Sequence, residues 1–302
     1  MRRVLGILLV LTALSAVPGS ALARDGAGST AAATTPSAVV VAAGDIACPP
    51  GYPVTSSQCR QAATAKIAIA QNPVRVLGLG DLQYQKGGYS DFVNSYAKSW
   101  GKLKSVTYPI PGNHEYMTSG AAGYYRYFQY RQPGAPGYYR RVVNGWQLYM
   151  LNSNCTAIDC AAQRTWLEKQ LTAHPSRCAL IATHHPRFSS GGEHGSQTFV
   201  KPFWTIAYRH HVDIALAGHD HDYERFAPMN PSGQLSSTGI QEFVSGAGGR
   251  SHYGKGATVP GSQRFINTAF GVLKLTLLPT SYRWSFIDTA GKVRDSGSAS
   301  CR

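Results

Sequence analysis

Five short apolar runs, each followed by Asp, Asn or His, limit the fold of this chain more than any other feature. The runs cover residues 39–44, 76–80, 109–112, 179–183 and 214–218, and the polar residues after them are Asp45, Asp81, Asn113 with His114, His184 with His185, and His219 with His221. Runs of this length and composition predict buried β-strands. In α/β sheets the carboxyl ends of the strands share one crevice, so we expect these side chains to converge.

Helix-like stretches alternate with the apolar runs, which is typical of an α/β protein. Strands are expected over residues 38–43, 74–79, 106–110, 138–143, 146–151, 178–182 and 212–217, and helices over 58–71, 89–100, 161–173 and 199–210. Near the end, residues 240–245, 269–278 and 282–288 follow one another without helices. We therefore expect an α/β fold that closes with antiparallel strands.

Residues 1–23 have the features of a secretory signal peptide. Arg2 and Arg3 provide a positive start, residues 4–17 an apolar core too short to span a bilayer, and Ala21-Leu22-Ala23 a small-x-small cleavage site. Residues 24–37 are rich in Ala, Thr, Gly and Ser and are expected to form a flexible leader. The rest, 38–302, is expected to be a single domain, secreted after cleavage near Ala23 and without a transmembrane segment.

Export permits disulfides, and the six cysteines form an even set. The short intervals favour the pairs Cys48–Cys59 and Cys155–Cys160, which leaves Cys178–Cys301 as the third. A zinc knuckle is the alternative use of these residues, but no C-x-x-C spacing is present.

The charge balance is basic, with 29 Lys and Arg against 15 Asp and Glu and a formal charge of +14. Such a balance suggests an anionic partner, whether a phosphate ester, a nucleic acid or an envelope surface. The basic residues are scattered, without a run of five or an arginine-rich arm. This distribution does not indicate a dedicated nucleic-acid footprint, and small phosphate esters are the expected partners.

Carboxylate, amide and imidazole groups without cysteine are suited to hard or borderline divalent and trivalent ions. An open catalytic site for one ion uses three or four protein ligands, and the strand ends offer more than that. The candidates are Asp45, Asp81, Asn113, His184, His219 and His221. Two ions about 3.5 to 4 Å apart, with a carboxylate between them, would use them all. The sequence therefore predicts a dinuclear metal site.

The motifs resemble, in order, those of calcineurin-like metallophosphoesterases, and particularly purple acid phosphatases. They are Gly44-Asp45, Gly80-Asp81-Leu82-Gln83-Tyr84, Gly112-Asn113-His114-Glu115, His184-His185-Pro186 and Gly218-His219-Asp220-His221. The resemblance runs from about Val39 to Arg225 and implies a four-layer αββα sandwich with the dinuclear centre at the strand ends. It implies that one ion is held by Asp45, Tyr84 and His221, that the other is held by Asn113, His184 and His219, and that Asp81 bridges them.

Tyr84 narrows the resemblance to purple acid phosphatases, in which a tyrosine three residues after the bridging aspartate supplies a phenolate that favours trivalent iron. The implied cofactors are Fe(III) and a divalent Fe, Zn or Mn ion. The usual Gly-Asp-x-Gly opening is here Gly44-Asp45-Ile46-Ala47, so the first loop departs from the family pattern.

Residues beside the expected ligands are candidates for contact with substrate. By position, His114 and His194 match residues that in relatives contact the phosphoryl group or the leaving oxygen, so they are the predicted catalytic residues. The predicted substrate-binding residues are Asn113, His185, Arg187 and Tyr223, and Arg225 could also neutralise phosphate.

These features favour a secreted acid or alkaline phosphatase that hydrolyses phosphate monoesters. Two ions lower the pKa of bound water and clamp phosphoryl oxygens, so metal-bound hydroxide would attack phosphorus while His194 or His114 protonates the leaving oxygen. A phosphodiesterase or nucleotidase on the same core is the main alternative. A noncatalytic envelope-binding protein is a third possibility, although it should have lost at least one ligand.

Overall fold

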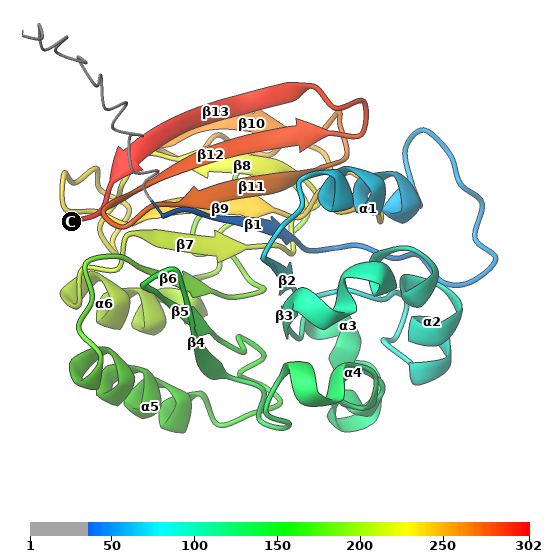
Figure 1. The fold of residues 1–302 in the computed structure, drawn as a ribbon, viewed down its shortest axis with the longest axis horizontal. Helices are drawn as coiled ribbons and strands as arrows, with labels where there is room; N and C mark the ends of the chain where they lie inside the picture. The colour runs from blue at the N-terminus through cyan, green and yellow to red at the C-terminus, as the bar shows by residue number, and fades with distance from the viewer. Residues whose placement is uncertain (1–35) are drawn as a thin grey trace, which may run out of the picture. The chain divides into compact units, whose positions relative to one another are not determined.

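Two β-sheets organise residues 36–302, the part of the chain that this computed structural model describes (Figure 1). Within these residues the first sheet has six strands in the order β13-β12-β11-β1-β2-β3, and the second has seven in the order β10-β8-β9-β7-β6-β5-β4. The predicted α/β class is confirmed. The expected signal peptide lies outside the described residues, as does most of the expected leader.

The strands of the first sheet are β1 (Ala38–Ala43), β2 (Arg75–Leu79), β3 (Thr107–Ile110), β11 (Gly271–Leu277), β12 (Ser281–Asp288) and β13 (Val293–Ser300). Those of the second are β4 (Tyr139–Val143), β5 (Trp146–Met150), β6 (Ala179–Ala182), β7 (Ile214–Ala217), β8 (Tyr223–Phe226), β9 (Gln241–Ser245) and β10 (Ser262–Ile266). The α-helices are α1 (Gln61–Ala70), α2 (Tyr89–Asn94), α3 (Asn113–Tyr116), α4 (Ala122–Phe128), α5 (Cys160–Ala173) and α6 (Lys201–Arg209). Short 3₁₀ helices are η1 (Tyr96–Lys98), η2 (Trp100–Val106), η3 (Ser119–Ala121), η4 (Gln129–Arg131) and η5 (Thr198–Val200).

Parallel pairing brings the predicted strand ends to one edge of each sheet. β1, β2 and β3 run parallel to one another, as do β5, β6, β7 and β9. The carboxyl ends of β1, β2 and β3 therefore leave the first sheet together, and those of β6 and β7 leave the second sheet together. The loops after these strands carry the candidate ligands.

Both faces of the central strands are buried, which explains their continuous apolar runs. In β1, Val40 and Ala42 belong to a buried cluster that also contains Leu148 and Leu180 of the second sheet. The alternate residue Val41 belongs to another cluster, which includes residues of α1, α2 and α4. A third cluster joins the second sheet to α5 and α6, and Figure 1 shows these two helices beside β5 and β6.

The sequence of helix α5 explains which face is buried and where the helix begins. Its buried residues Cys160, Gln163, Leu167 and Leu171 recur at helical spacing and face the second sheet. The carboxylate of Asp159 caps the helix by accepting hydrogen bonds from the N–H groups of the second and third residues.

Most expected elements agree with the observed ones to within a few residues, and the differences have physical causes. The helix expected over 89–100 ends at Asn94 and continues as η1 and η2. Strands β8, β10 and β13 were not expected. β10 and β13 are polar strands at sheet edges, where neither pattern nor apolar content signals pairing.

The three expected disulfides are confirmed: Cys48–Cys59, Cys155–Cys160 and Cys178–Cys301. The first two close short loops, with sequence separations of 11 and 5, whereas the third spans 123 residues and ties β6 to the end of β13. Disulfides of this kind indicate an oxidising compartment. Across residues 36–302 no helix has the length and apolar character needed to cross a membrane.

Candidate metal centre

Sharp turns after the strands direct the candidate ligands into one site. Asp45, Asp81 and His219 have left-handed backbones with φ values of 59°, 48° and 72°, which is uncommon for residues with a Cβ and typical of functional sites. Each follows a glycine. A Cβ on Gly80 would lie 2.6 Å from His184 Nδ1, so only glycine lets this backbone approach the imidazole.

Four side-chain atoms that could bind a metal lie close together, with the phenol oxygen of Tyr84 in the middle, and we call this group the Tyr84 cluster. Tyr84 Oη lies 2.8 Å from Asp45 Oδ1, 2.9 Å from His221 Nε2 and 3.2 Å from Asp81 Oδ2. His221 Nε2 is also 3.5 Å from Asp45 Oδ1. All four side chains are buried.

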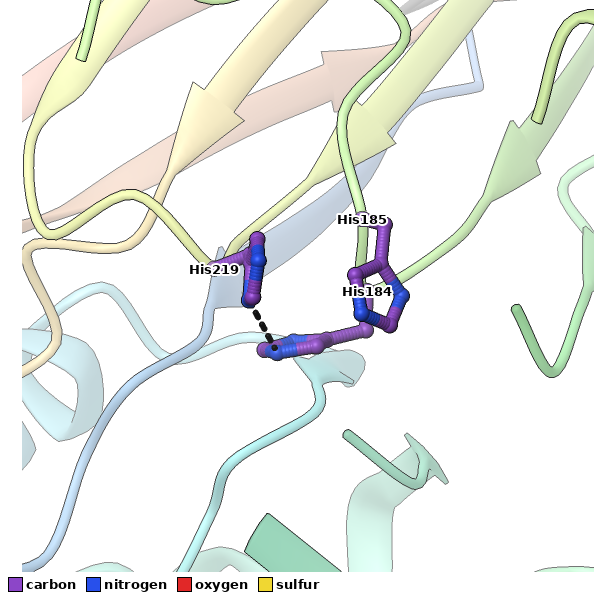
Figure 2. Close-up of side chains that lie close together, drawn as sticks. All are labelled: His184, His185 and His219. Atoms are coloured by element: carbon purple, nitrogen blue, oxygen red, sulfur yellow. Dashed lines mark hydrogen bonds between the residues drawn. The ribbon is translucent and has the colours of Figure 1, made fainter. Parts of the chain in front are cut away.

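A second group, the His184 cluster, surrounds the Nε2 atom of His184. This nitrogen lies 3.0 Å from Asn113 Oδ1, 3.2 Å from His219 Nδ1 and 3.3 Å from Asp81 Oδ2. Figure 2 shows the imidazoles of His184 and His219 turned toward each other. The Nδ1 atom of His184 is 2.8 Å from the carbonyl oxygen of Leu79, which fixes the ring and leaves Nε2 facing the cluster.

The same oxygen, Asp81 Oδ2, belongs to both clusters. The structure thus divides the predicted ligands into the two sets implied by the resemblance, with Asp81 between them. The nearest ligand atoms of Asp45, Asp81 and His184 all lie within 4.8 Å of one another, close enough to hold a metal ion.

The polar atoms of the two clusters are arranged in a way that suits bound cations. The Tyr84 hydroxyl carries a single proton and lies within 3.2 Å of two carboxylate oxygens and of His221 Nε2, and His184 Nε2 faces two oxygens and a nitrogen. Burial beside Asp45 and Asp81 raises the pKa of Tyr84 well above its usual value. Burial alone would lower the pKa of His184, but the Asp81 carboxylate outweighs it and raises this pKa to about 9. The carboxylates of Asp81 and Asp45 contribute to both shifts, and a metal ion would neutralise their charge.

Glu115 holds the two loops that carry Asp81 and Asn113. Its Oε2 accepts hydrogen bonds from the N–H groups of Asp81 and Gly112 at 2.8 and 2.7 Å, and its Oε1 accepts from Leu82 and Gln83 at 2.9 and 3.2 Å. Glu115 is fully buried, and burial together with Asp81 raises its pKa to about 8. The sequence placed this residue in a motif but gave no indication of its role.

The two predicted catalytic histidines border the clusters from different elements, His114 from α3 and His194 from a loop after β6. His114 Nε2 is 3.9 Å from Asp81 Oδ2, and its Nδ1 donates to the carbonyl oxygen of Gln85 at 2.6 Å. The ring of His194 stacks on that of His219, with centroids 4.0 Å apart and an interplanar angle of 21°. Asp220 holds the His194 loop by accepting hydrogen bonds from the N–H groups of His194 and Gly195.

The predicted substrate-binding residues divide into two groups. Asn113 is in the His184 cluster, and the ring of His185 lies 4.4 Å from that of His219. Arg187 instead donates to the carbonyl oxygen of Pro231 at 3.1 Å, with its guanidinium over the ring of Phe188. The Tyr223 hydroxyl donates to Asp295, and its ring stacks on Phe286. Arg225 also pairs with Asp295. The structure therefore does not bring Arg187, Tyr223 or Arg225 to the clusters.

Residues 250–253, which follow β9, reach the site without having been predicted. The ring of Tyr253 stacks on His221 with centroids 3.8 Å apart, and Ser251 Oγ lies 2.8 Å from His221 Nδ1. The guanidinium of Arg250 lies 5.2 Å from the centre of the Tyr84 ring. The signal that could have found them is the glycine-rich turn that follows the apolar end of β9, because this strand also ends at the shared edge.

Comparison with known proteins places these features in a family. Residues 38–223 match the sequence model described as calcineurin-like phosphoesterase. Tartrate-resistant acid phosphatase type 5 of Sus scrofa is 27% identical over an alignment that covers 95% of this chain and 93% of that protein. Acid phosphatase A of Cryphonectria parasitica is 33% identical over 76 residues, 23% of this chain and 15% of that protein.

The fold is also similar to that of purple acid phosphatase PPD1 from yellow lupin (Lupinus luteus) seeds, with a TM-score of 0.71 and 20% identity. That match covers 88% of this chain but 54% of the lupin chain, so this chain spans about half the length of the lupin protein and a smaller part of the Cryphonectria protein. From its strand-end motifs, its two donor clusters and the match over residues 38–223, the chain belongs to the calcineurin-like phosphoesterase family and has a fold of the purple acid phosphatase type.

Proposed function

We propose that this protein is a secreted, dinuclear metal-dependent phosphatase that hydrolyses phosphate monoesters. The observation that carries the proposal is the pair of buried donor clusters that share Asp81 Oδ2. Surplus buried acceptors on this scale are costly unless cations neutralise them. The family of the chain and the purple acid phosphatase fold support phosphate ester hydrolysis as the reaction.

In this proposal Asp45, Tyr84 and His221 would hold one ion. Asn113, His184 and His219 would hold the other, and Asp81 would serve both. When bound, two such ions lower the pKa of water and polarise phosphoryl oxygens. The phenol of Tyr84 supports Fe(III) in the first position, with a divalent Fe, Zn or Mn ion in the second.

The residues of the chain supply positioning and the proton. We assign proton donation to His194, whose ring is kept beside His219 by stacking and by the hold of Asp220 on its loop. His114 is the second candidate, because its Nε2 points toward Asp81. Asn113 and His185 remain the proposed substrate contacts. Arg187 and Tyr223 are not among them, since Nη2 of Arg187 donates to Pro231 and the hydroxyl of Tyr223 donates to Asp295, both away from the clusters.

Secretion is part of the proposal. Three disulfides in residues 36–302 support an oxidising destination, and residues 1–23 supply the expected signal peptide. The catalytic domain is proposed to cover residues 38–302, since strands from β1 through β13 belong to the two sheets that carry the site.

The experiment that tests the function combines metal analysis with turnover of mono- and diesters. Asp81→Asn should abolish turnover and lower bound metal toward one ion or none, because the bridging oxygen contacts both clusters. Asp213→Asn is the matched control: this buried carboxylate accepts hydrogen bonds from backbone N–H groups at the opposite end of β6 and β7. It should keep both ions and the activity.

Full activity and undiminished metal in Asp81→Asn would contradict the dinuclear assignment. Faster turnover of diesters than of monoesters would mean that the protein is a phosphodiesterase and not a monoesterase. Two bound ions without any turnover would leave a noncatalytic binding protein.

A further inference from the structure

A cavity of about 400 Å³ lies beside the His184 cluster. Asn113 and His185 line it on the side of the cluster. The remaining lining comes from residues 153–156, which follow β5, and from Phe199 in η5. The cavity therefore borders the side of the centre to which Asn113 belongs.

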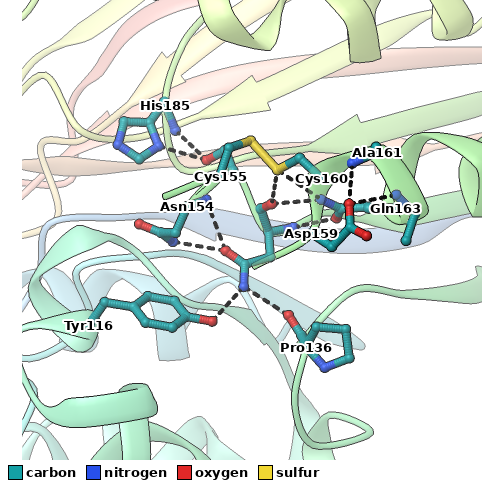
Figure 3. The surroundings of a disulfide bond; sticks show 12 residues. Tyr116, Pro136, Asn154, Cys155, Asp159, Cys160, Ala161, Gln163 and His185 are labelled. Carbon is teal, nitrogen blue, oxygen red and sulfur yellow. Dashed lines mark hydrogen bonds between the residues drawn. A yellow bond between two sulfur atoms is a disulfide. The ribbon is translucent and has the colours of Figure 1, made fainter. Parts of the chain in front are cut away.

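The wall formed by residues 153–156 is held by covalent and hydrogen bonds (Figure 3). Cys155 is joined to Cys160 at the start of α5. Ser153 Oγ lies 2.7 Å from His185 Nδ1 and accepts a hydrogen bond from the N–H of His185 at 3.1 Å. A wall fixed in this way loses little conformational freedom when a ligand binds, so it can contribute to selectivity.

Asn154 lines the cavity, and its side chain carries a hydrogen-bond acceptor. Its Nδ2 donates to the carbonyl oxygen of Pro111 at 3.1 Å and to Asn152 Oδ1 at 2.8 Å. Among residues 36–302 no donor reaches Asn154 Oδ1, and Figure 3 shows this oxygen on the side of the amide away from the hydrogen-bonded nitrogen. A ligand group that donates a hydrogen bond would satisfy it.

Phe199 gives the cavity an aromatic surface. This side chain is 42% exposed, and the centre of its ring lies 5.1 Å from that of His185 with the two planes at 69°. The lining contains no Lys, Arg, Asp or Glu. A carboxylate or a second phosphate would find no cation there, whereas a neutral aromatic group would cover Phe199 and the disulfide loop.

We propose that this cavity binds the ester group of the substrate and selects phosphate monoesters of neutral aromatic or heteroaromatic alcohols that carry a hydrogen-bond donor. The proposal rests on the proposed function and deepens it by naming a substrate class. Phe199 and Asn154 are specificity-determining residues in this arrangement, and neither belongs to the donor clusters.

Binding of two non-hydrolysable phosphonates tests the cavity separately from turnover. Methylphosphonate and 4-aminobenzylphosphonate share the group that the metal centre would hold and differ in the part that would enter the cavity. Calorimetric titration of the metal-loaded protein should give a Kd for the aromatic phosphonate about tenfold or more below that of methylphosphonate. Phe199→Ala should reduce this ratio roughly three- to tenfold without changing the Kd of methylphosphonate.

Two further variants sharpen the test. Tyr130→Ala is the control, since Tyr130 is an aromatic residue that is 89% exposed and does not line the cavity. It should leave both Kd values unchanged. Thr156→Lys, at an exposed lining position, should bring a cation to the cavity and tighten binding of phosphonoacetate relative to methylphosphonate.

Equal Kd values for the two phosphonates in the unmodified protein, or an equal loss for both in Phe199→Ala, would overturn the proposal. Aromatic preference in binding without hydrolysis of any ester would refute the proposed function and leave the cavity assignment standing. Hydrolysis of esters without aromatic preference in binding would refute the cavity assignment and leave the proposed function standing. Failure of either phosphonate to bind would count against both.

Discussion

Replacing Glu115 by Gln tests whether the metal centre depends on a residue whose side chain binds backbone N–H groups rather than the ligand atoms of the clusters. The carboxylate accepts four hydrogen bonds from backbone N–H groups, two at each oxygen, and these come from the loops that carry Asp81 and Asn113. Glutamine has the same shape. Its amide oxygen can still accept two of the bonds, but its NH₂ group must face two N–H donors.

The expected loss of stability follows from the number of hydrogen bonds that the substitution removes. A pKa of about 8 keeps Glu115 mainly protonated at pH 7, so each bond joins neutral groups and contributes about 0.5 to 1.5 kcal/mol; losing two of them should lower the free energy of unfolding by about 1 to 3 kcal/mol. The loops would also lose their fixed relation to each other. Outer partners of metal ligands are typically worth about 10- to 100-fold in metal affinity, and Glu115→Gln should weaken metal binding by that factor.

Two measurements separate the effects. Urea unfolding monitored by far-UV circular dichroism gives the loss of stability, and competition with a chelator for Zn²⁺ below the unfolding transition gives the metal affinity. Asp213→Asn serves as control, because it also impairs a buried carboxylate that accepts backbone N–H bonds, but at the other end of the strands. It should lower stability by about 1.5 to 3 kcal/mol and leave Zn²⁺ affinity unchanged.

If Glu115→Gln loses stability but binds Zn²⁺ as tightly as the unmodified protein, Glu115 supports the fold without positioning the site. If it loses neither, the hydrogen bonds described here do not hold the loops. Either result would refute the reasoning.

Four further measurements address other parts of the structure. Tyr84→Phe should remove the visible absorption of the metal-loaded protein if a phenolate binds Fe(III), and an absorption band that survives the substitution would contradict that ligand. His194→Ala should keep both ions yet lose up to about 10²- to 10⁴-fold in rate on alkyl phosphates and far less on p-nitrophenyl phosphate, because only a basic leaving oxygen needs the proton; equal losses would reassign His194 to phosphate positioning. Replacing both residues of Cys178–Cys301 by alanine should lower the free energy of unfolding by about 5 kcal/mol, and the same change in Cys155–Cys160 should lower it by about 2 kcal/mol, because the disulfide with the longer loop restricts the unfolded chain more. Equal losses in urea unfolding would contradict this dependence on loop length. Burial alone would raise the pKa of Asp295, but hydrogen bonds from a guanidinium, a phenol and an indole outweigh burial and hold this pKa below its usual value. Asp295→Asn should therefore lower the free energy of unfolding by about 1 to 3 kcal/mol at pH 7, and by progressively less as the pH falls below about 4. A loss that does not depend on pH would refute the charged interaction.

The positions of the candidate ligands were predictable because local sequence decides where a buried strand ends. The apolar run before Asp45 or Asp81 needs no tertiary information to be recognised, and parallel pairing then brings the ends together. The division into two clusters came from the resemblance, and the distances within each cluster agree with it.

Residues whose roles depend on distant partners could not be predicted. Glu115 accepts three of its four hydrogen bonds from the backbone of residues 81–83, which are distant in sequence, so its own neighbours do not reveal its function. Arg187 follows His184 closely, but Glu242 of β9 accepts the N–H groups of Arg187 and Phe188, which turns the backbone and sends the guanidinium toward Pro231. Proximity in sequence to a ligand was therefore misleading here.

The place of β1 in the first sheet has a consequence for the order of folding. β1 pairs with β2, the next strand along the chain, and on its other edge with β11, so that Ala38 lies opposite Leu277. During synthesis one edge of β1 therefore stays unpaired until residues 271–277 have been made. An open strand edge can pair with another chain, and pairing across so long a separation is slow. The sheet that carries Asp45 and Asp81 is completed last, after every other candidate ligand has been synthesised.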